Sequence, residues 1–108
     1  MQASITDDML DANGFLVDRA LWTPAVAEAF AELESITLTD AHWEIISLIQ
    51  RFYEEFDGSP ANRALVKYVR IELGPEKGNS IYLMSLFPSS PTRLASRIAG
   101  LPKPKNCL

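Results

Sequence analysis

Three pairs of a hydroxyl residue followed by proline set where helices can begin in this chain. The pairs are Thr23-Pro24, Ser59-Pro60 and Ser90-Pro91. A hydroxyl oxygen can accept a hydrogen bond from a free backbone N–H at a helix N-terminus, and proline fits the first helical position because it has no N–H to lose. Each pair therefore predicts the start of a helix.

The spacing of apolar residues extends these starts into five predicted helices. Apolar side chains recur three and four positions apart, as they do on the buried face of a helix. Glycines after the second and third segments supply stops. The predicted helices cover residues 24–34, 40–56, 60–73, 80–87 and 91–99. The second is the longest and is expected to form the centre of the core through Trp43, Ile46, Ile49, Phe52, Tyr53 and Phe56.

Residues 4–17 predict a β-hairpin before the first helix. Asn13-Gly14 is a strong turn signal because both residues tolerate a positive φ. Apolar residues precede this turn, and Phe15, Leu16 and Val17 follow it. With the five helices, the hairpin predicts one α+β domain that is mainly α.

The segment after the last predicted helix reads as an arm that carries a thiol. Pro102 and Pro104 exclude a helix there, because each lacks an N–H and favours extended geometry in the residue before it. At roughly 3.1 Å per residue in polyproline geometry, eight residues extend about 25 Å. The arm carries Cys107, the one cysteine of the chain. We therefore predict a domain of residues 1–100 and a mobile arm of residues 101–108.

Cys107 is the group with the greatest intrinsic reactivity. A free thiol has a pKa of about 8.5, so a few per cent is nucleophilic thiolate at pH 7. Lys103 and Lys105 favour the thiolate, whereas the terminal carboxylate opposes it. No second cysteine offers a disulfide, and a prenylation signal would need the cysteine four residues from the end. The alternative is an incidental cysteine near the terminus.

Charge divides the chain into two unlike parts. Residues 1–58 carry twelve acidic and two basic residues, and residues 59–108 carry two acidic and eight basic residues. The basic part is expected to meet an acidic partner surface or RNA phosphates, with a solvated basic face as the alternative. No apolar run approaches the roughly 18 residues of a membrane helix, and no signal peptide is evident. We expect a cytoplasmic protein that does not enter membranes.

Other site chemistries find little support. His42 is the one histidine and Cys107 is remote from it, so no metal site is expected. The Gly-rich loop at 74–78 lacks the Gly-Lys-Ser/Thr ending of a phosphate loop. The predicted helices 40–56 and 60–73 can form a helix-turn-helix, so a DNA-binding regulator stays an alternative, with the polar residues Asn62, Arg63, Lys67 and Arg70 on its second helix.

Six stretches together resemble the DsrC/TusE family of sulfur-relay proteins. They are LTDAHWE at 38–44, RFYEEF at 51–56, SPANR at 59–63, LGPEKG at 73–78, LFP at 86–88, and IAGLPKP at 98–104 followed by Cys107. The resemblance implies a small orthogonal helical bundle with an N-terminal β-hairpin and a mobile C-terminal arm. It also implies that Cys107 accepts sulfane sulfur as a persulfide, with no cofactor.

The resemblance further implies partners. A TusD-like subunit of a TusBCD-like complex would give sulfur to Cys107, and an MnmA-like thiouridylase would receive it for 2-thiolation of the tRNA wobble uridine. Basic residues near the thiol are candidates for docking partners or steadying the persulfide: Arg93, Arg97, Lys103 and Lys105.

One position departs from the DsrC pattern. DsrC proper has a second cysteine eleven residues before the penultimate one, and this chain has Ser96 there. An intramolecular disulfide is then unavailable, which favours the TusE-like branch over a partner of dissimilatory sulfite reductase. The reductase partner stays the first alternative.

Overall fold

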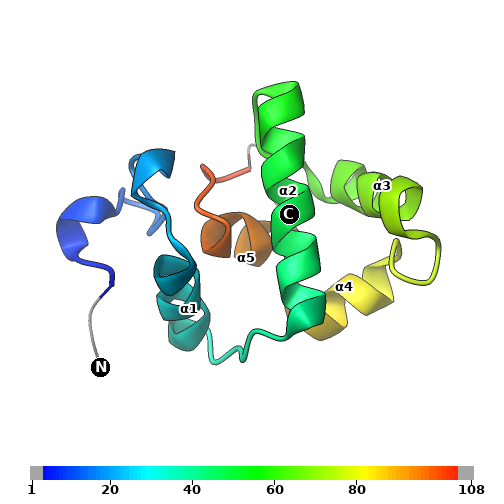
Figure 1. The fold of residues 1–108 in the computed structure, drawn as a ribbon, viewed down its shortest axis with the longest axis horizontal. Helices are drawn as coiled ribbons and strands as arrows, with labels where there is room; N and C mark the ends of the chain where they lie inside the picture. Colours follow the sequence, from blue (N-terminus) through cyan, green and yellow to red (C-terminus); the bar gives the residue numbers. More distant parts are fainter. Residues whose placement is uncertain (1–3, 105–108) are drawn as a thin grey trace.

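Helices build the part of the chain that the computed structural model describes, residues 4–104 (Figure 1). Two short 3-10 turns, η1 (Asp7–Met9) and η2 (Arg19–Leu21), come first. Within residues 4–104, no helix has both the length and the apolar content that crossing a bilayer requires. The helices are α1 (Pro24–Leu33), α2 (Asp40–Phe56), α3 (Asn62–Leu73), α4 (Ser80–Leu86) and α5 (Pro91–Ile98).

The central helix is α5, although it is one of the shortest. It lies behind α2 in Figure 1, with α1 on one side and α3 and α4 on the other, and it contacts all four. Most of its side chains are buried, namely Pro91, Thr92, Leu94, Ala95, Ser96 and Ile98. The prediction that the α2 stripe forms the centre of the core is confirmed for Ile46 and Ile49, which are buried, and is wrong at the C-terminal end of α2, where Phe56 is 57% exposed.

The helix starts follow the hydroxyl–proline pairs in two of three cases. The Thr23 hydroxyl accepts the Val26 N–H at 3.2 Å, and α1 begins at Pro24 as predicted. The start of α5 at Pro91 is also confirmed. The prediction for α3 is wrong by two residues, because the Ser59 hydroxyl donates instead to the Pro102 carbonyl, at 2.6 Å.

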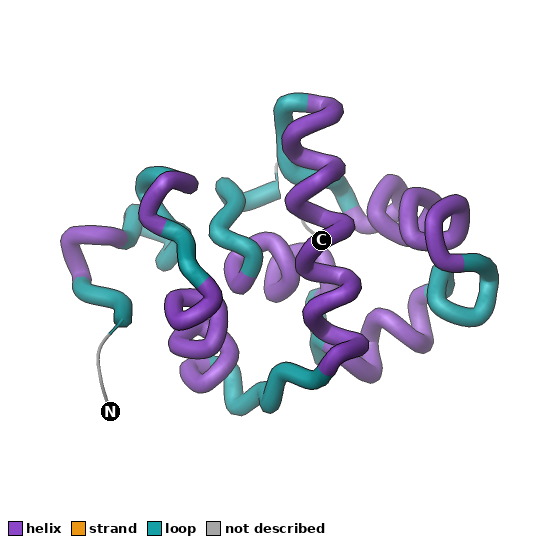
Figure 2. The backbone as a smooth tube through the Cα atoms, in the orientation of Figure 1, coloured by secondary structure: helices purple, strands orange, loops and turns teal. Residues whose placement is uncertain are grey.

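The N-terminal β-hairpin is not formed. Leu10 and Leu16 make a single antiparallel bridge, and Figure 2 shows no strand in the described residues. The turn η1 interrupts the expected first strand. The Asp11 carboxylate then accepts the N–H groups of Asn13 at 2.8 Å and Phe15 at 3.0 Å, which closes a loop wider than a two-residue turn. The mainly helical class is confirmed and the hairpin is wrong.

His42 ties the start of α2 to the end of α4. Its Nδ1 accepts the Thr39 N–H at 3.1 Å, and its Nε2 lies 2.8 Å from the Leu86 carbonyl oxygen. Because the amide can only donate and the carbonyl can only accept, Nδ1 acts as the acceptor and Nε2 as the donor. The buried ring also meets Phe87 edge-on, with ring centroids 5.2 Å apart. One side chain thus satisfies backbone groups of two helices.

We expect His42→Ala to lower the free energy of unfolding by about 2–3 kcal/mol, because it leaves a backbone donor and a backbone acceptor without partners. His42→Asn should lose about half as much, since an Asn amide can replace Nδ1 but cannot reach Leu86. Urea unfolding followed by circular dichroism measures both. Losses below about 0.5 kcal/mol in both variants would contradict the role of His42 in joining α2 to α4.

Candidate functional site

The structure describes the base of the arm, residues 101–104, and how it is seated on the body. The predicted nucleophile Cys107 and Lys105 lie outside the described residues. Leu101 is fully buried and belongs to the core, and Pro104 is also buried. Burial of a leucine side chain stabilises a fold by about 1.5–3 kcal/mol. The body therefore continues past Gly100, where the arm was predicted to begin.

Two backbone hydrogen bonds end α5 in a Schellman motif. The Gly100 N–H donates to the Arg97 carbonyl at 3.1 Å, and the Leu101 N–H donates to the Ser96 carbonyl at 2.9 Å. This motif needs a residue in the left-handed conformation directly after the helix end, and Gly100 adopts it with a φ of +80°. The chain then turns sharply and places Leu101 in the core.

Side chains from distant parts of the chain take the remaining carbonyls at this end. Trp22 Nε1 donates to the Ile98 carbonyl at 2.8 Å, and Gln50 Nε2 donates to the Ala99 carbonyl at 2.9 Å. The Trp22 ring also covers Gly100 so closely that an added Cβ would lie 2.5 Å from Trp22 Cδ1. Both long-range bonds hold the point from which the arm departs.

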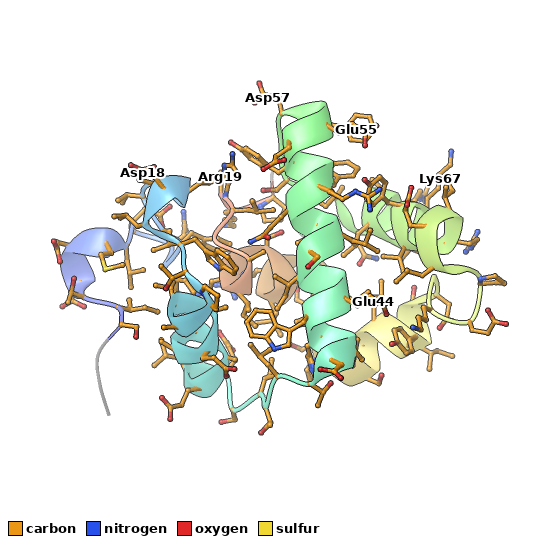
Figure 3. All side chains as sticks on the ribbon, viewed as in Figure 1. Asp18, Arg19, Glu44, Glu55, Asp57 and Lys67 are labelled. Atoms are coloured by element: carbon orange, nitrogen blue, oxygen red, sulfur yellow. The ribbon has the colours of Figure 1, made fainter. Side chains whose placement is uncertain are left out.

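The next part of the arm runs beside the C-terminal half of α2 (Figure 1). The Ser59 hydroxyl bonds the Pro102 carbonyl there. A surface hollow of about 410 Å³ lies alongside, next to the end of α2 where Figure 3 labels Asp57. Lys103 is exposed and faces this hollow. The lining residues are Tyr53, Asp57, Gly58, Ser59, Ala61, Pro102 and Lys103.

The two arginines of α5 have unlike surroundings. Arg97 Nη1 forms an ion pair with Glu34 at 2.6 Å, and Arg97 Nε donates to the Gly14 carbonyl at 2.8 Å. Its side chain is only 14% exposed, so this placement argues against partner binding by Arg97. Arg93 is half-buried, with its guanidinium carbon 5.7 Å from the centre of the Phe15 ring. Of the predicted cations in the described part of the chain, Lys103 is the one that is exposed, and it lies on the arm itself.

The sequence interpretation missed the residues that seat the arm: Trp22, Gln50 and Ser59. Gly100 signals the end of α5, and a buried helix end must have partners for its carbonyls. No local pattern says which distant donors supply them, because Trp22 and Gln50 lie 76 and 49 positions from their acceptors. Within residues 4–104, no group of three His, Cys, Asp or Glu side chains is placed to hold a metal ion.

The whole described fold and the arm match a known protein family. The family model described as "DsrC like protein" matches residues 4–108, which includes the arm. The chain belongs to the DsrC family. Similar proteins include the sulfurtransferase TusE of Pectobacterium atrosepticum, which is 50% identical in sequence over 91% of this chain and 90% of that protein. The sulfurtransferase TusE homolog of Haemophilus influenzae is 51% identical over the same shares.

Solved DsrC structures share the fold. DsrC of Allochromatium vinosum is 46% identical, with a TM-score of 0.82 over 92% of this chain and 88% of that one. The oxidised gamma-subunit of the dissimilatory sulfite reductase (DsrC) of Archaeoglobus fulgidus is 40% identical, with a TM-score of 0.77 over 92% and 90%. Both identities are high enough that family membership does not rest on shape alone.

We expect Gly100→Ala to lower the free energy of unfolding by about 2 kcal/mol or more, because the new methyl meets Trp22 and alanine resists the left-handed conformation. The melting temperature should fall by roughly 10 °C. Gly58→Ala is the matched control, since nothing lies within 4 Å of a Cβ added there. Equal melting temperatures for the two variants would contradict the close fit at Gly100.

We expect Arg97→Gln to cost about 2–3 kcal/mol of stability, since it leaves Glu34 unpaired in a partly buried position. Arg93→Gln should cost less than about 1 kcal/mol, because it loses only a contact with an aromatic ring. Denaturant unfolding of both variants measures the difference. A smaller loss for Arg97→Gln than for Arg93→Gln would reverse the assignment of Arg97 as a structural residue.

Proposed function

We propose that this protein is a sulfur carrier, in which Cys107 accepts a sulfane sulfur as a persulfide and passes it to another protein. The observation that carries the proposal is the family match, which runs through residue 108 and so covers the arm with its cysteine. Relatives named sulfurtransferase TusE, at about half identity over most of the chain, support the same activity.

The proposed reaction is an exchange of sulfur bonds that balances without a cofactor. The Cys107 thiolate attacks the outer sulfur of a donor persulfide, R–S–SH. A bond forms between Cys107 Sγ and that sulfur, the donor S–S bond breaks, and its electron pair leaves on the donor thiolate. An acceptor thiolate then attacks the outer sulfur on Cys107 in the same way and releases the Cys107 thiolate. No net oxidation or reduction takes place.

The seating of the arm restricts where transfer can occur. Pro104 is buried against the body, and Cys107 follows it by three residues. Three extended residues span at most about 11 Å, far less than the 25 Å predicted for a free arm of eight residues. The active site of a partner must therefore come close to the body, near the hollow beside Ser59 and Lys103.

The proposed relay has a donor and an acceptor. A TusD-like subunit of a TusBCD-like complex gives sulfur to Cys107, and an MnmA-like thiouridylase with bound tRNA receives it for 2-thiolation of the wobble uridine. We place this relay in the cytoplasm. Lys103 and Lys105 remain the proposed contacts for the anionic persulfide or for acidic groups of the partner, and Arg93 is a weaker candidate because it is half-buried.

A partner role with dissimilatory sulfite reductase is the second candidate function. Similarity to a chain described as the gamma-subunit of that reductase favours it. Against it, Ser96 stands where the DsrC pattern has a second cysteine. Ser96 is fully buried on α5, and its hydroxyl has no hydrogen-bond partner. With one sulfur atom in the pair, Cys107 cannot close an intramolecular disulfide, so transfer of sulfur between proteins is the better supported chemistry.

We expect incubation with glutathione persulfide to add the mass of one sulfur atom to the chain, because Cys107 is its one thiol. Intact-mass spectrometry measures the gain, and reduction with dithiothreitol should remove it. Cys107→Ser should gain nothing, whereas the matched variant Ser96→Ala should gain as much as the parent. Equal gains in Cys107→Ser and the parent would sink the carrier proposal.

A further inference from the structure

Three adjoining hollows form one continuous surface over α3 and α4. The first, of about 380 Å³, is lined by α3 residues and Ser80. A second of about 110 Å³ shares Asn62 and Ser80 with it and adds Met84. A third of about 330 Å³ shares Ser80 and Met84 and adds Ile81. We call this the α3–α4 surface; its principal side chains are Arg63, Lys67, Arg70, Ser80, Ile81 and Met84.

One part of this surface is cationic and lacks counter-charges. Arg63, Lys67 and Arg70 follow one another at one-turn spacing on α3 and line the first hollow. Figure 3 shows Lys67 at the side of the molecule away from α1. No acidic residue lines any of the three hollows, and within residues 4–104 neither Arg63 nor Lys67 forms an ion pair. The positive charge is therefore open to a ligand.

Arg70 and the nearby Lys77 differ from these two cations. Arg70 Nε donates to the Gly78 carbonyl at 3.2 Å, which fixes the guanidinium beside the hollow. Lys77 is already paired, because its ammonium lies 2.8 Å from the Glu44 carboxylate, and this contact raises the pKa of Lys77. Lys77 is thus a structural cation, and the open charge comes from α3.

The other part of the surface is apolar and exposed. Ile81 is 85% exposed and Met84 is 43% exposed, one turn apart on α4. Protein interfaces combine an apolar centre with a polar rim, and exposed aliphatic side chains beside charges fit that pattern. Sites for single-stranded nucleic acid instead stack bases on aromatic rings. No aromatic residue lines the three hollows, so the surface suits a protein ligand better than RNA.

We infer that the α3–α4 surface binds an acidic amphipathic segment of a partner protein. Carboxylates of that segment pair with Arg63, Lys67 and Arg70, and its apolar face covers Ile81 and Met84. The surface adjoins the arm, because Ala61 lines the hollow at the arm base and the next residue, Asn62, lines the cationic hollow. A partner that covers both hollows therefore also meets the base of the arm. This role in sulfur transfer rests on the proposed function, whereas the binding itself does not.

The test is a titration of the 15N-labelled full chain with a synthetic amphipathic helical peptide that carries glutamates on one face and leucines on the adjacent face. We expect amide shifts to change at residues 63, 67, 80 and 84. The double variant Arg63→Gln/Lys67→Gln should raise the Kd about tenfold, and Ile81→Ser should raise it about fivefold. The matched controls Arg51→Gln on α2 and Leu33→Ser on α1 should keep the parent Kd, since both side chains are exposed elsewhere.

Three results would overturn the inference. The first is an unchanged Kd in the double variant. The second is equal affinity of the parent chain for the glutamate peptide and for a peptide with lysines in place of the glutamates. The third is binding of tRNA or duplex DNA at residues 63 and 67 by a chain that does not bind the peptide. The last result would favour a nucleic-acid site on α3. Glutathione persulfide should still add sulfur to the double variant. Failure of the parent chain to bind the peptide counts against the surface alone, and failure of the parent chain to take up sulfur counts against the carrier function.

Discussion

Capture of the carbonyls at the end of α5 is the interaction on which the rest of the structure depends. An α5 that lies among four other helices must end inside the protein, where an unpaired carbonyl is costly. Backbone amides of Gly100 and Leu101 take two of the carbonyls, and the side chains of Trp22 and Gln50 take the next two. The same four bonds therefore join the N-terminal segment, α2 and the arm to the central helix.

This arrangement fixes the direction of the arm as well as its origin. Because Leu101 is in the core and Ser59 holds Pro102, the proline-rich segment leaves along the end of α2. Under the proposed carrier function, partners must settle against the body, because Pro104 is buried three residues before the thiol. The hollow at the base of the arm and the cationic hollow on α3 are linked through the neighbouring residues Ala61 and Asn62 at the start of α3.

The sequence predicted those elements whose signals are local. The α1 start at Thr23-Pro24 and the Gly74 stop of α3 were confirmed, because caps act within one turn of helix. The β-hairpin does not form because η1 occupies the expected first strand and the Asp11 carboxylate accepts the backbone N–H groups of Asn13 and Phe15. Ser59 and Arg97 were assigned by type, as a cap and a docking cation, but their partners are Pro102 and Glu34, far away in sequence. Such pairings are decided by packing, which no short pattern records.

The buried Ser96 hydroxyl forms no hydrogen bond, so its oxygen could be exchanged for sulfur without the loss of a polar contact. A single atom at this site thus separates two kinds of sulfur protein. With oxygen there, the chain has one thiol, so a disulfide can form only with a second molecule, whereas sulfur at this position would give the chain two thiols.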